Sequence, residues 1–201
     1  MYLRKLEMKD APLMLEWMHD PSVVEKLHTN FAEKKLADAE GFISWSRDNF
    51  PEPPAMDALP DALSGSGSDE FGKLQESEKK DESGRDLHLA IASGGDEYLG
   101  TVSLRHMKDG SAEFAITIRK GAMGTGAGWF GMSEILKKGF REYGLQEIFW
   151  CVSAENERAV RFYRKHDFRE ISEKEVPAEI RARYEEANDF LWFVATGETL
   201  E

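Results

Sequence analysis

Ile116-Thr-Ile-Arg-Lys-Gly-Ala-Met-Gly-Thr-Gly-Ala-Gly128 is the stretch of sequence that decides the fold. It starts as an apolar strand, passes through a glycine-rich turn and enters a helix whose apolar residues recur at helical spacing as far as Tyr143. The first N–H groups of a helix have no partner within the helix, and glycines let a ligand approach them closely. The stretch therefore predicts a loop that binds an anion such as a phosphate group.

A second motif follows, Asn156-Glu-Arg-Ala-Val-Arg-Phe-Tyr163. It comes after an apolar run at 147–152, which reads as a strand, and it predicts a helix from about 156 to 165. Asn156 and Tyr163 are seven residues apart, which is two helical turns, so their side chains share one face of this helix. We expect both side chains to point at the same end of a ligand.

The rest of the chain mixes helices and strands. Asp10, Pro12 and the Asp20-Pro21 pair mark the start and end of one helix. Further elements are expected as a strand at 2–6, a helix at about 35–49, strands at 87–92, 98–104, 112–118 and 168–173, a helical turn at 177–187 and a strand at 190–195. Short turns join the three middle strands, which indicates an antiparallel meander and an α+β fold.

The bulk properties are those of a single-domain enzyme. The chain has 201 residues, a net charge of −12 and a pI near 5.0, which argues against binding nucleic acid or an anionic membrane surface. Neither a signal peptide nor an apolar stretch of membrane-spanning length is found, so a cytoplasmic location is expected. Cys151 is the only cysteine and the five histidines are scattered, so no metal is expected.

Residues 51–86 differ in composition from the rest. They hold four of the seven prolines and a single aromatic residue, and their ten acidic and four basic residues contribute 4 − 10 = −6, half of the net charge. Such a segment cannot bury enough apolar surface to offset the entropy of ordering it. It is predicted to be a flexible acidic insertion within one domain that spans residues 1–201.

The glycine loop fits two other phosphate-binding patterns less well. A Walker loop ends in Gly-Lys-Ser/Thr, but here Trp129 follows Gly128. Gly126-Ala-Gly-Trp-Phe-Gly131 matches the dinucleotide pattern, with Glu155 downstream, but Ile118 lies eight residues before the first glycine of that pattern, where a strand should end directly before it. A dinucleotide-dependent oxidoreductase therefore remains the less favoured alternative.

The two motifs together resemble the core of the GNAT superfamily, the acyl-CoA-dependent N-acyltransferases. Gly124-Thr-Gly126 matches the end of the family's Arg/Gln-x-x-Gly-x-Gly/Ala loop, although Gly121 stands where Arg or Gln is usual. The segment from Asn156 to Phe168 resembles the family's Asn-x-x-Ala-x-x-Phe/Leu-Tyr-x-Lys-x-Gly-Phe, with Asp167 in place of Gly. The resemblance implies a mostly antiparallel central sheet of six to seven strands flanked by helices.

This resemblance also implies a binding site for acetyl-CoA as co-substrate. The strand end would lie along the pantetheine arm, the loop amides would hold the pyrophosphate, and nearby cations would add positive charge. The implied binding residues are Ile116, Thr117, Ile118, Arg119, Lys120, Met123, Gly124, Thr125, Gly126, Ala127, Gly128, Asn156, Phe162 and Lys165.

Three residues are candidates for the chemistry. By resemblance, Tyr163 protonates the departing thiolate, Asn156 contacts the pantetheine or the amide near the thioester, and Glu113, directly or through water, deprotonates the attacking amine. A backbone N–H near Ile116 would polarise the thioester carbonyl. A catalytically silent sensor of acyl-CoA is the alternative of another class.

The acceptor is expected to be a primary amine: a polyamine, an amino sugar, another small amine or a protein N-terminus. Trp17-Met-His-Asp-Pro-Ser22 matches the N-terminal signature of the branch that acts on ribosomal-protein N-termini, spermidine and amino sugars. The acidity of the chain mildly favours a cationic acceptor. The resemblance leaves a homodimer open.

Overall fold

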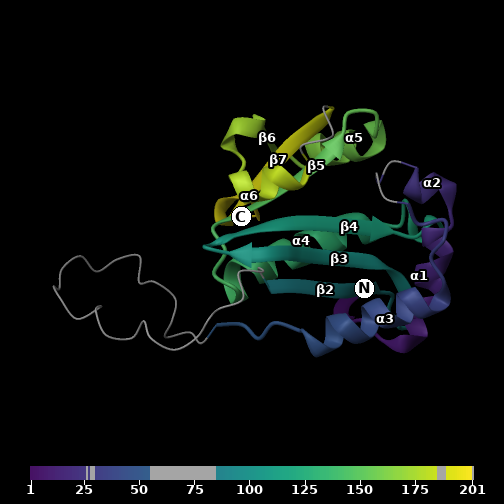
Figure 1. Ribbon diagram of the computed structural model, residues 1–201. Helices are drawn as coiled ribbons and strands as arrows, with labels where there is room; N and C mark the ends of the chain where they lie inside the picture. Colours follow the sequence, from purple (N-terminus) through teal and green to yellow (C-terminus); the bar gives the residue numbers. More distant parts are fainter. Residues whose placement is uncertain (26, 28–29, 55–84, 185–188, 201) are drawn as a thin grey trace.

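A computed structural model describes residues 1–25, 27, 30–54, 85–184 and 189–200 of the protein (Figure 1). Its centre is a seven-stranded sheet in the order β1-β2-β3-β4-β5-β7-β6. Of the strand pairs described, only β4 with β5 is parallel. The strands are β1 (Tyr2–Lys5), β2 (Arg85–Ala92), β3 (Tyr98–Lys108), β4 (Ser111–Ile118), β5 (Glu147–Ser153), β6 (Arg169–Ile171) and β7 (Phe190–Thr196). The expected α+β fold with a mostly antiparallel sheet is confirmed.

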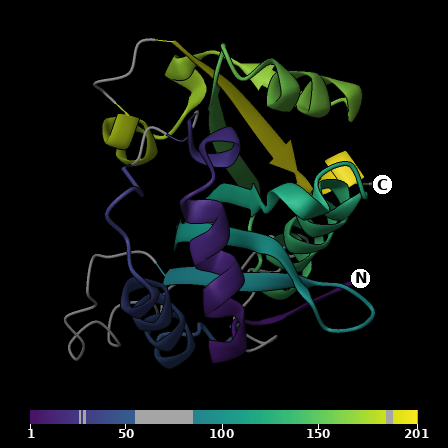
Figure 2. The ribbon, with the colours of Figure 1, turned by 90° about the vertical axis from the view of Figure 1, so that its right-hand side faces the viewer.

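Helices cover both faces of the sheet. One face carries α1 (Ala11–Met18) and α3 (Leu36–Asp48) over its first strands, and Figure 2 shows α1, in purple, crossing those strands. On the same face, α6 (Ala178–Arg181) packs against β5 and β7 through Ile180. The opposite face carries α4 (Ala127–Glu142) and α5 (Glu157–Lys165), whose buried residues join the largest apolar core. A single turn, α2 (Pro21–Val24), follows α1.

The β3–β4 hairpin contains a tight turn and a bulge. Asp109 and Gly110 form the turn with φ of 49° and 78°, the left-handed conformations that a two-residue hairpin requires. Between the paired positions Lys108–Ser111 and Arg105–Glu113, β3 has one more residue than β4. His106, with φ of 55°, lies in this bulge, and its N–H donates to Asp86 Oδ1 at 2.7 Å. As a result Arg105 and Glu113 stand side by side.

β4 and β5 pair only over their first residues and then part. The paired positions are Ser111–Glu147, Ala112–Ile148 and Glu113–Phe149. Beyond them β4 stays paired with β3 as far as Ile118, whereas β5 stays paired with β7 as far as Ser153. Figure 1 shows the two strands diverging, so the sheet opens in a V at its middle.

The N-terminus of α1 departs from expectation. Asp10 occupies the N-cap position, but its carboxylate does not cap the helix. Instead it accepts hydrogen bonds from both terminal nitrogens of Arg4, at 2.7 and 2.8 Å, and from the backbone N–H of Glu7, at 2.9 Å. The helix ends at Met18, and Asp20 caps the following turn by accepting the N–H of Ser22.

Other expected elements lie within a few residues of their predicted bounds. Gly144 (φ 66°) follows α4, and Asp167 (φ 56°) takes the left-handed turn expected of it after α5. Of the predicted insertion at 51–86, residues 55–84 lie outside the described residues. At its start, the carbonyl of Pro51 accepts the Tyr143 hydroxyl at 2.9 Å, and at its end Arg85 already belongs to β2.

None of the helices that the structure describes is both long and apolar enough to cross a membrane.

Close packing of α4 on the sheet depends on a glycine. At Gly131 a Cβ would overlap Ile91 Cδ1 and lie 2.9 Å from Ile91 Cγ1, and Ile91 is fully buried. We predict that Gly131→Ala lowers the free energy of unfolding by about 1–3 kcal/mol, because the buried side chain cannot move aside.

Gly41→Ala in α3 is the matched control, since a Cβ there meets nothing within 4 Å. This variant should be more stable than the parent by about 0.5–1 kcal/mol, because alanine favours a helix interior. Urea unfolding of both variants makes the comparison, and equal stabilisation of the two would show that α4 is not held against the sheet at Gly131.

Candidate active site

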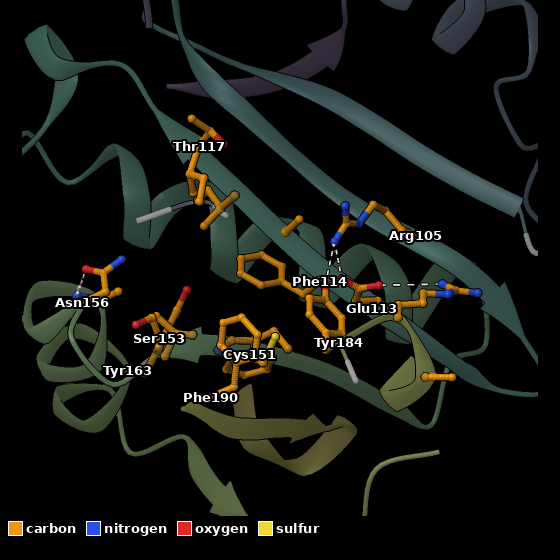
Figure 3. A pocket seen from close by; sticks show the side chains of 18 of the residues that line it. Arg105, Glu113, Phe114, Thr117, Cys151, Ser153, Asn156, Tyr163, Tyr184 and Phe190 are labelled. Carbon is orange, nitrogen blue, oxygen red and sulfur yellow. Dashed lines mark hydrogen bonds and ion pairs between the residues drawn. The ribbon is translucent and has the colours of Figure 1, made fainter. Parts of the chain in front are cut away.

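A cleft of about 950 Å³ lies where β4 and β5 part. Its walls are the residues from Glu113 to Thr117 on β4 and from Trp150 to Ser153 on β5, and α5 contributes Asn156 and Tyr163. Figure 3 shows Asn156, Ser153 and Tyr163 on one side of the cleft and Arg105, Glu113 and Tyr184 on the other. The structure thus brings together five of the residues predicted from sequence: Glu113, Ile116, Thr117, Asn156 and Tyr163.

Glu113 lies at the vertex of the V and is only 2% exposed. Its Oε1 accepts hydrogen bonds from the Arg105 guanidinium and from the Tyr184 hydroxyl. Its Oε2 lies 3.8 Å from Arg183 Nη1 and 3.9 Å from His106 Nε2. A buried carboxylate needs such partners, because desolvation of a lone charge costs several kcal/mol or more. Oε2, which accepts no hydrogen bond from the described residues, is the oxygen that could take up a proton.

Tyr163 is a buried residue of α5 whose ring packs against Trp150 and Phe193, with ring centroids 5.4 and 5.2 Å away. Burial is the main cause that raises the pKa of its hydroxyl above the usual value near 10, and the neighbouring Cys151 adds to the rise. The hydroxyl therefore keeps its proton at neutral pH. A protonated phenol at the wall of a cleft can act as a general acid.

Asn156 begins α5 as its N-cap. Its side-chain Oδ1 accepts the N–H of Ala159 at 3.2 Å, which fixes the orientation of the amide. With Oδ1 engaged in this way, Nδ2 is the group that can donate to a ligand in the cleft. Asn156 thus combines a structural role with a donor aimed at the site.

Cys151, on β5, lies half-buried in the cleft wall. Burial, with a further contribution from the charge of Glu113, raises the pKa of Cys151 to about 12. The thiol is therefore protonated at neutral pH and is a poor nucleophile. We therefore interpret Cys151 as a packing residue.

The glycine loop leads directly into a helix, as the sequence predicted. Gly124 and Gly126 have φ of 82° and 89°, and a Cβ at either position would meet nothing within 4 Å. Open space therefore lies against the backbone just before α4, which starts at Ala127 with Gly126 as its N-cap. Thr125 Oγ1 donates to the carbonyl of Ala122 at 2.7 Å, which holds the turn. A phosphate group fits such a site by charge and by size.

Three cations flank this loop, and two of them have acidic partners. Arg119 forms an ion pair with Glu97, and Lys120 Nζ lies 3.8 Å from Asp20 Oδ2. Arg158, from the first turn of α5, contacts Met123 Sδ in the loop, and no described carboxylate lies within ion-pair distance of it. Arg158 is therefore the cation with the most charge to offer an anion at the loop, although the sequence reasoning did not select it.

The other predicted binding residues lie outside the cleft wall. Ile118 is half-buried against the apolar core and Gly128 lies in the first turn of α4. On α5, Phe162 packs against the core with its ring centroid 4.8 Å from that of His166, and Lys165 is the exposed last residue of the helix.

Sequence reasoning missed the cluster around Glu113. Tyr184 and Arg183 come from the one-turn segment after α6, where the sequence carries no motif. Arg105 could have been found only by allowing for the bulge, because a regular hairpin counted back from Lys108–Ser111 pairs Arg105 with Phe114. Within the described part of the chain, no group of three or more His, Cys, Asp or Glu side chains is arranged to hold a metal ion.

Comparison with known proteins agrees with this geometry. The family model described as "Acetyltransferase (GNAT) domain" matches residues 1–169. No curated protein matched the chain.

Solved structures share the fold at low sequence identity. A spermidine N-acetyltransferase from Vibrio cholerae in complex with CoA and spermine superposes with a TM-score of 0.65 and 16% identity, over 99% of this chain and 96% of that one. The F149A mutant of the Vibrio cholerae enzyme superposes with a TM-score of 0.62 and 19% identity, over 100% of this chain and 98% of that one. A GNAT-family acetyltransferase from Bacillus anthracis superposes with a TM-score of 0.61 and 16% identity, over 98% of this chain and 94% of that one.

The glycine loop, the divergence of β4 from β5 and the family match, which spans most of the chain, lead to one conclusion. This protein belongs to the GNAT acetyltransferase family and is an acyl-CoA-dependent N-acetyltransferase.

Proposed function

We propose that the protein transfers an acetyl group from acetyl-CoA to a primary amine by direct attack, without a covalent enzyme intermediate. The observation that carries this proposal is the cleft between β4 and β5, lined by Glu113, Asn156 and Tyr163. A solved structure of similar fold holds CoA and spermine, which supports a CoA ester as donor and an amine as acceptor.

The cleft and the glycine loop fit two different parts of the donor. The open space against Gly124 and Gly126 suits a pyrophosphate, and Arg158 adds a cation there. Among the described residues, no strand pairs with the edge of β4 beyond Glu113 on its β5 side, so the backbone groups of this edge can hydrogen-bond an extended pantetheine arm. Asn156 Nδ2 would donate to an amide of that arm.

Acyl transfer then needs two proton movements. An alkylamine has a pKa of about 10, by analogy with lysine, and must lose a proton before its nitrogen attacks the thioester carbon. Glu113 Oε2, directly or through a water, takes that proton. A backbone N–H near Ile116 stabilises the developing oxyanion. As the C–N bond forms and the C–S bond breaks, Tyr163 gives its proton to the leaving thiolate.

Tyr163→Phe tests the general acid. The substitution keeps the ring and its packing on Trp150, so folding and acetyl-CoA binding should barely change. We expect kcat to fall by roughly 10²–10⁴-fold, with the KM for acetyl-CoA little altered. Steady-state kinetics with thiol detection of released CoA measures both. Because burial raises the pKa of Tyr163 above 10, the wild type should lose no activity through deprotonation of Tyr163 below pH 10. Wild-type turnover by the variant under chemistry-limited conditions would leave water as the acid, whereas no turnover of any amine by the wild type would leave a silent sensor as the function.

Glu113→Gln tests the base. Glutamine can still accept from Arg105 and Tyr184, so the cluster keeps its hydrogen bonds. At pH 7 we expect kcat to fall at least about 100-fold. The defect should shrink as the pH approaches 10, because the acceptor amine then deprotonates in solution. A defect that is the same at every pH, together with a lower melting temperature, would assign Glu113 a purely structural role.

Arg158→Gln tests the cation at the loop. Loss of a charge-assisted contact to phosphate should raise the KM for acetyl-CoA about five- to tenfold and leave kcat nearly unchanged. S-acetylpantetheine lacks the phosphates, so its kinetics should be the same with the variant and the wild type. Arg161→Gln is the matched control, because Arg161 lies on the same helix with its side chain 77% exposed, near Glu157. If Arg158→Gln raises the KM for S-acetylpantetheine as much as the KM for acetyl-CoA, Arg158 does not act by binding the phosphates.

A further inference from the structure

A second, smaller cavity of about 350 Å³ adjoins the cleft on the face of the sheet that α1 and α3 cover. Ala115, Ile116 and Thr117 of β4 line both spaces, and so do Phe31 and Arg105. The two spaces therefore meet at the stretch of β4 where, under the proposed function, the thioester carbonyl lies. A molecule in the smaller cavity would approach that carbonyl from the side opposite α4.

The walls of this cavity are mainly apolar and aromatic. α1 contributes Met14, Trp17 and Met18, and α3 contributes Phe42. The ring of Phe31 packs edge-on against Trp17, with centroids 5.3 Å apart. Such walls bind apolar bodies by excluding water and offer flat faces to an aromatic ring.

Most of the polar groups on its floor already hydrogen-bond one another. Trp17 Nε1 donates to the Tyr98 hydroxyl at 3.1 Å, and that hydroxyl lies 2.7 Å from Thr101 Oγ1. His88 Nδ1 lies 2.7 Å from Ser103 Oγ, whereas His88 Nε2 has no hydrogen-bond partner among the described residues and offers a place for one polar group of a ligand. A ligand rich in polar groups would have to break these contacts or leave its own groups without partners, and both outcomes are unfavourable.

Charges at the cavity are likewise balanced. Asp38 is the one carboxylate among the described residues that line it, and this carboxylate accepts the N–H of Lys35 at 2.7 Å and lies 3.8 Å from Lys34 Nζ. The remaining charged residue of the described lining, Arg105, is paired with Glu113. A polyamine carries two or more ammonium groups, and within this lining each extra ammonium would lack an unpaired carboxylate.

From this balance we infer that the acceptor is a primary monoamine on an apolar body, an arylalkylamine or a short alkylamine. The inference rests on the proposed function and specifies its acceptor. The amino group points to β4 and the body occupies the cavity among Trp17, Phe31 and Phe42. A long polycation is the acceptor that this lining disfavours.

The test compares acceptors on the full chain with saturating acetyl-CoA. 2-Phenylethylamine should exceed spermidine in kcat/KM by at least about tenfold, because an ammonium desolvated without a partner costs more than one factor of ten. Equal or higher kcat/KM with spermidine overturns the inference and leaves the proposed function standing.

A binding measurement tests the inferred acceptor site separately from the proposed catalysis. Calorimetric titration of the CoA-bound protein with 2-phenylethylamine should show binding that Phe42→Ala weakens about tenfold and that Leu36→Ala, an exposed change on the same helix, leaves alone. If no amine turns over but this pattern holds, catalysis as proposed is wrong while the site is supported. Absence of the pattern overturns the site.

A change of charge gives the sharpest contrast. Lys34→Glu places a carboxylate at the cavity, and the spermidine to 2-phenylethylamine ratio of kcat/KM should rise about three- to tenfold. Lys35→Glu changes the net charge equally one residue away but outside the lining, and should leave the ratio within about twofold. Equal shifts from both variants would show long-range attraction in place of a local site, and would overturn the inference.

Discussion

The structure depends on one constraint: β4 and β5 share a ladder for only three residue pairs and cannot follow each other further. Each strand is held by its other neighbour, β4 by the β3 hairpin and β5 by β7, and these two halves of the sheet turn away from each other. Beyond these pairs, the facing edges have no strand partner in the described part of the chain. Backbone groups in that position need hydrogen bonds from elsewhere, so the same divergence that interrupts the sheet also prepares it to bind an extended ligand.

The sequence could predict what is local. The positive φ of Gly124 and Gly126, the N-cap at Asn156 and the left-handed turn at Asp167 each follow from a short motif. Contacts made across the fold could not be read in this way. Tyr184 reaches Glu113 from 71 residues away, and Arg158 reaches the glycine loop from another helix. Asp10 shows a subtler limit, because a cap residue in the expected place binds Arg4 instead.

Net charge is a poor guide to the charge at the site. The chain carries −12 overall, which from the sequence mildly favoured a cationic acceptor. Around the cleft, however, Arg105 and Arg183 surround the single buried carboxylate of Glu113, and Asp38 at the adjoining cavity has its own cation. Much of the acidity belongs to residues 51–86, most of which lie outside the described part of the chain. Long-range attraction and local recognition are therefore set by different residues.

The extra residue in β3 constrains how the sequence of the β3–β4 hairpin can evolve. Side chains alternate between the two faces of a strand. The bulge at His106 therefore sets the face of the sheet on which Arg105 and the β3 residues before it lie. If β3 paired regularly through His106, Arg105 would stand opposite Phe114 and would be parted from Glu113, although no amino acid at the site had been replaced. The contact between Arg105 and Glu113 thus depends on the irregular pairing of this hairpin, and a change that made the pairing regular would break it as surely as a substitution of either residue.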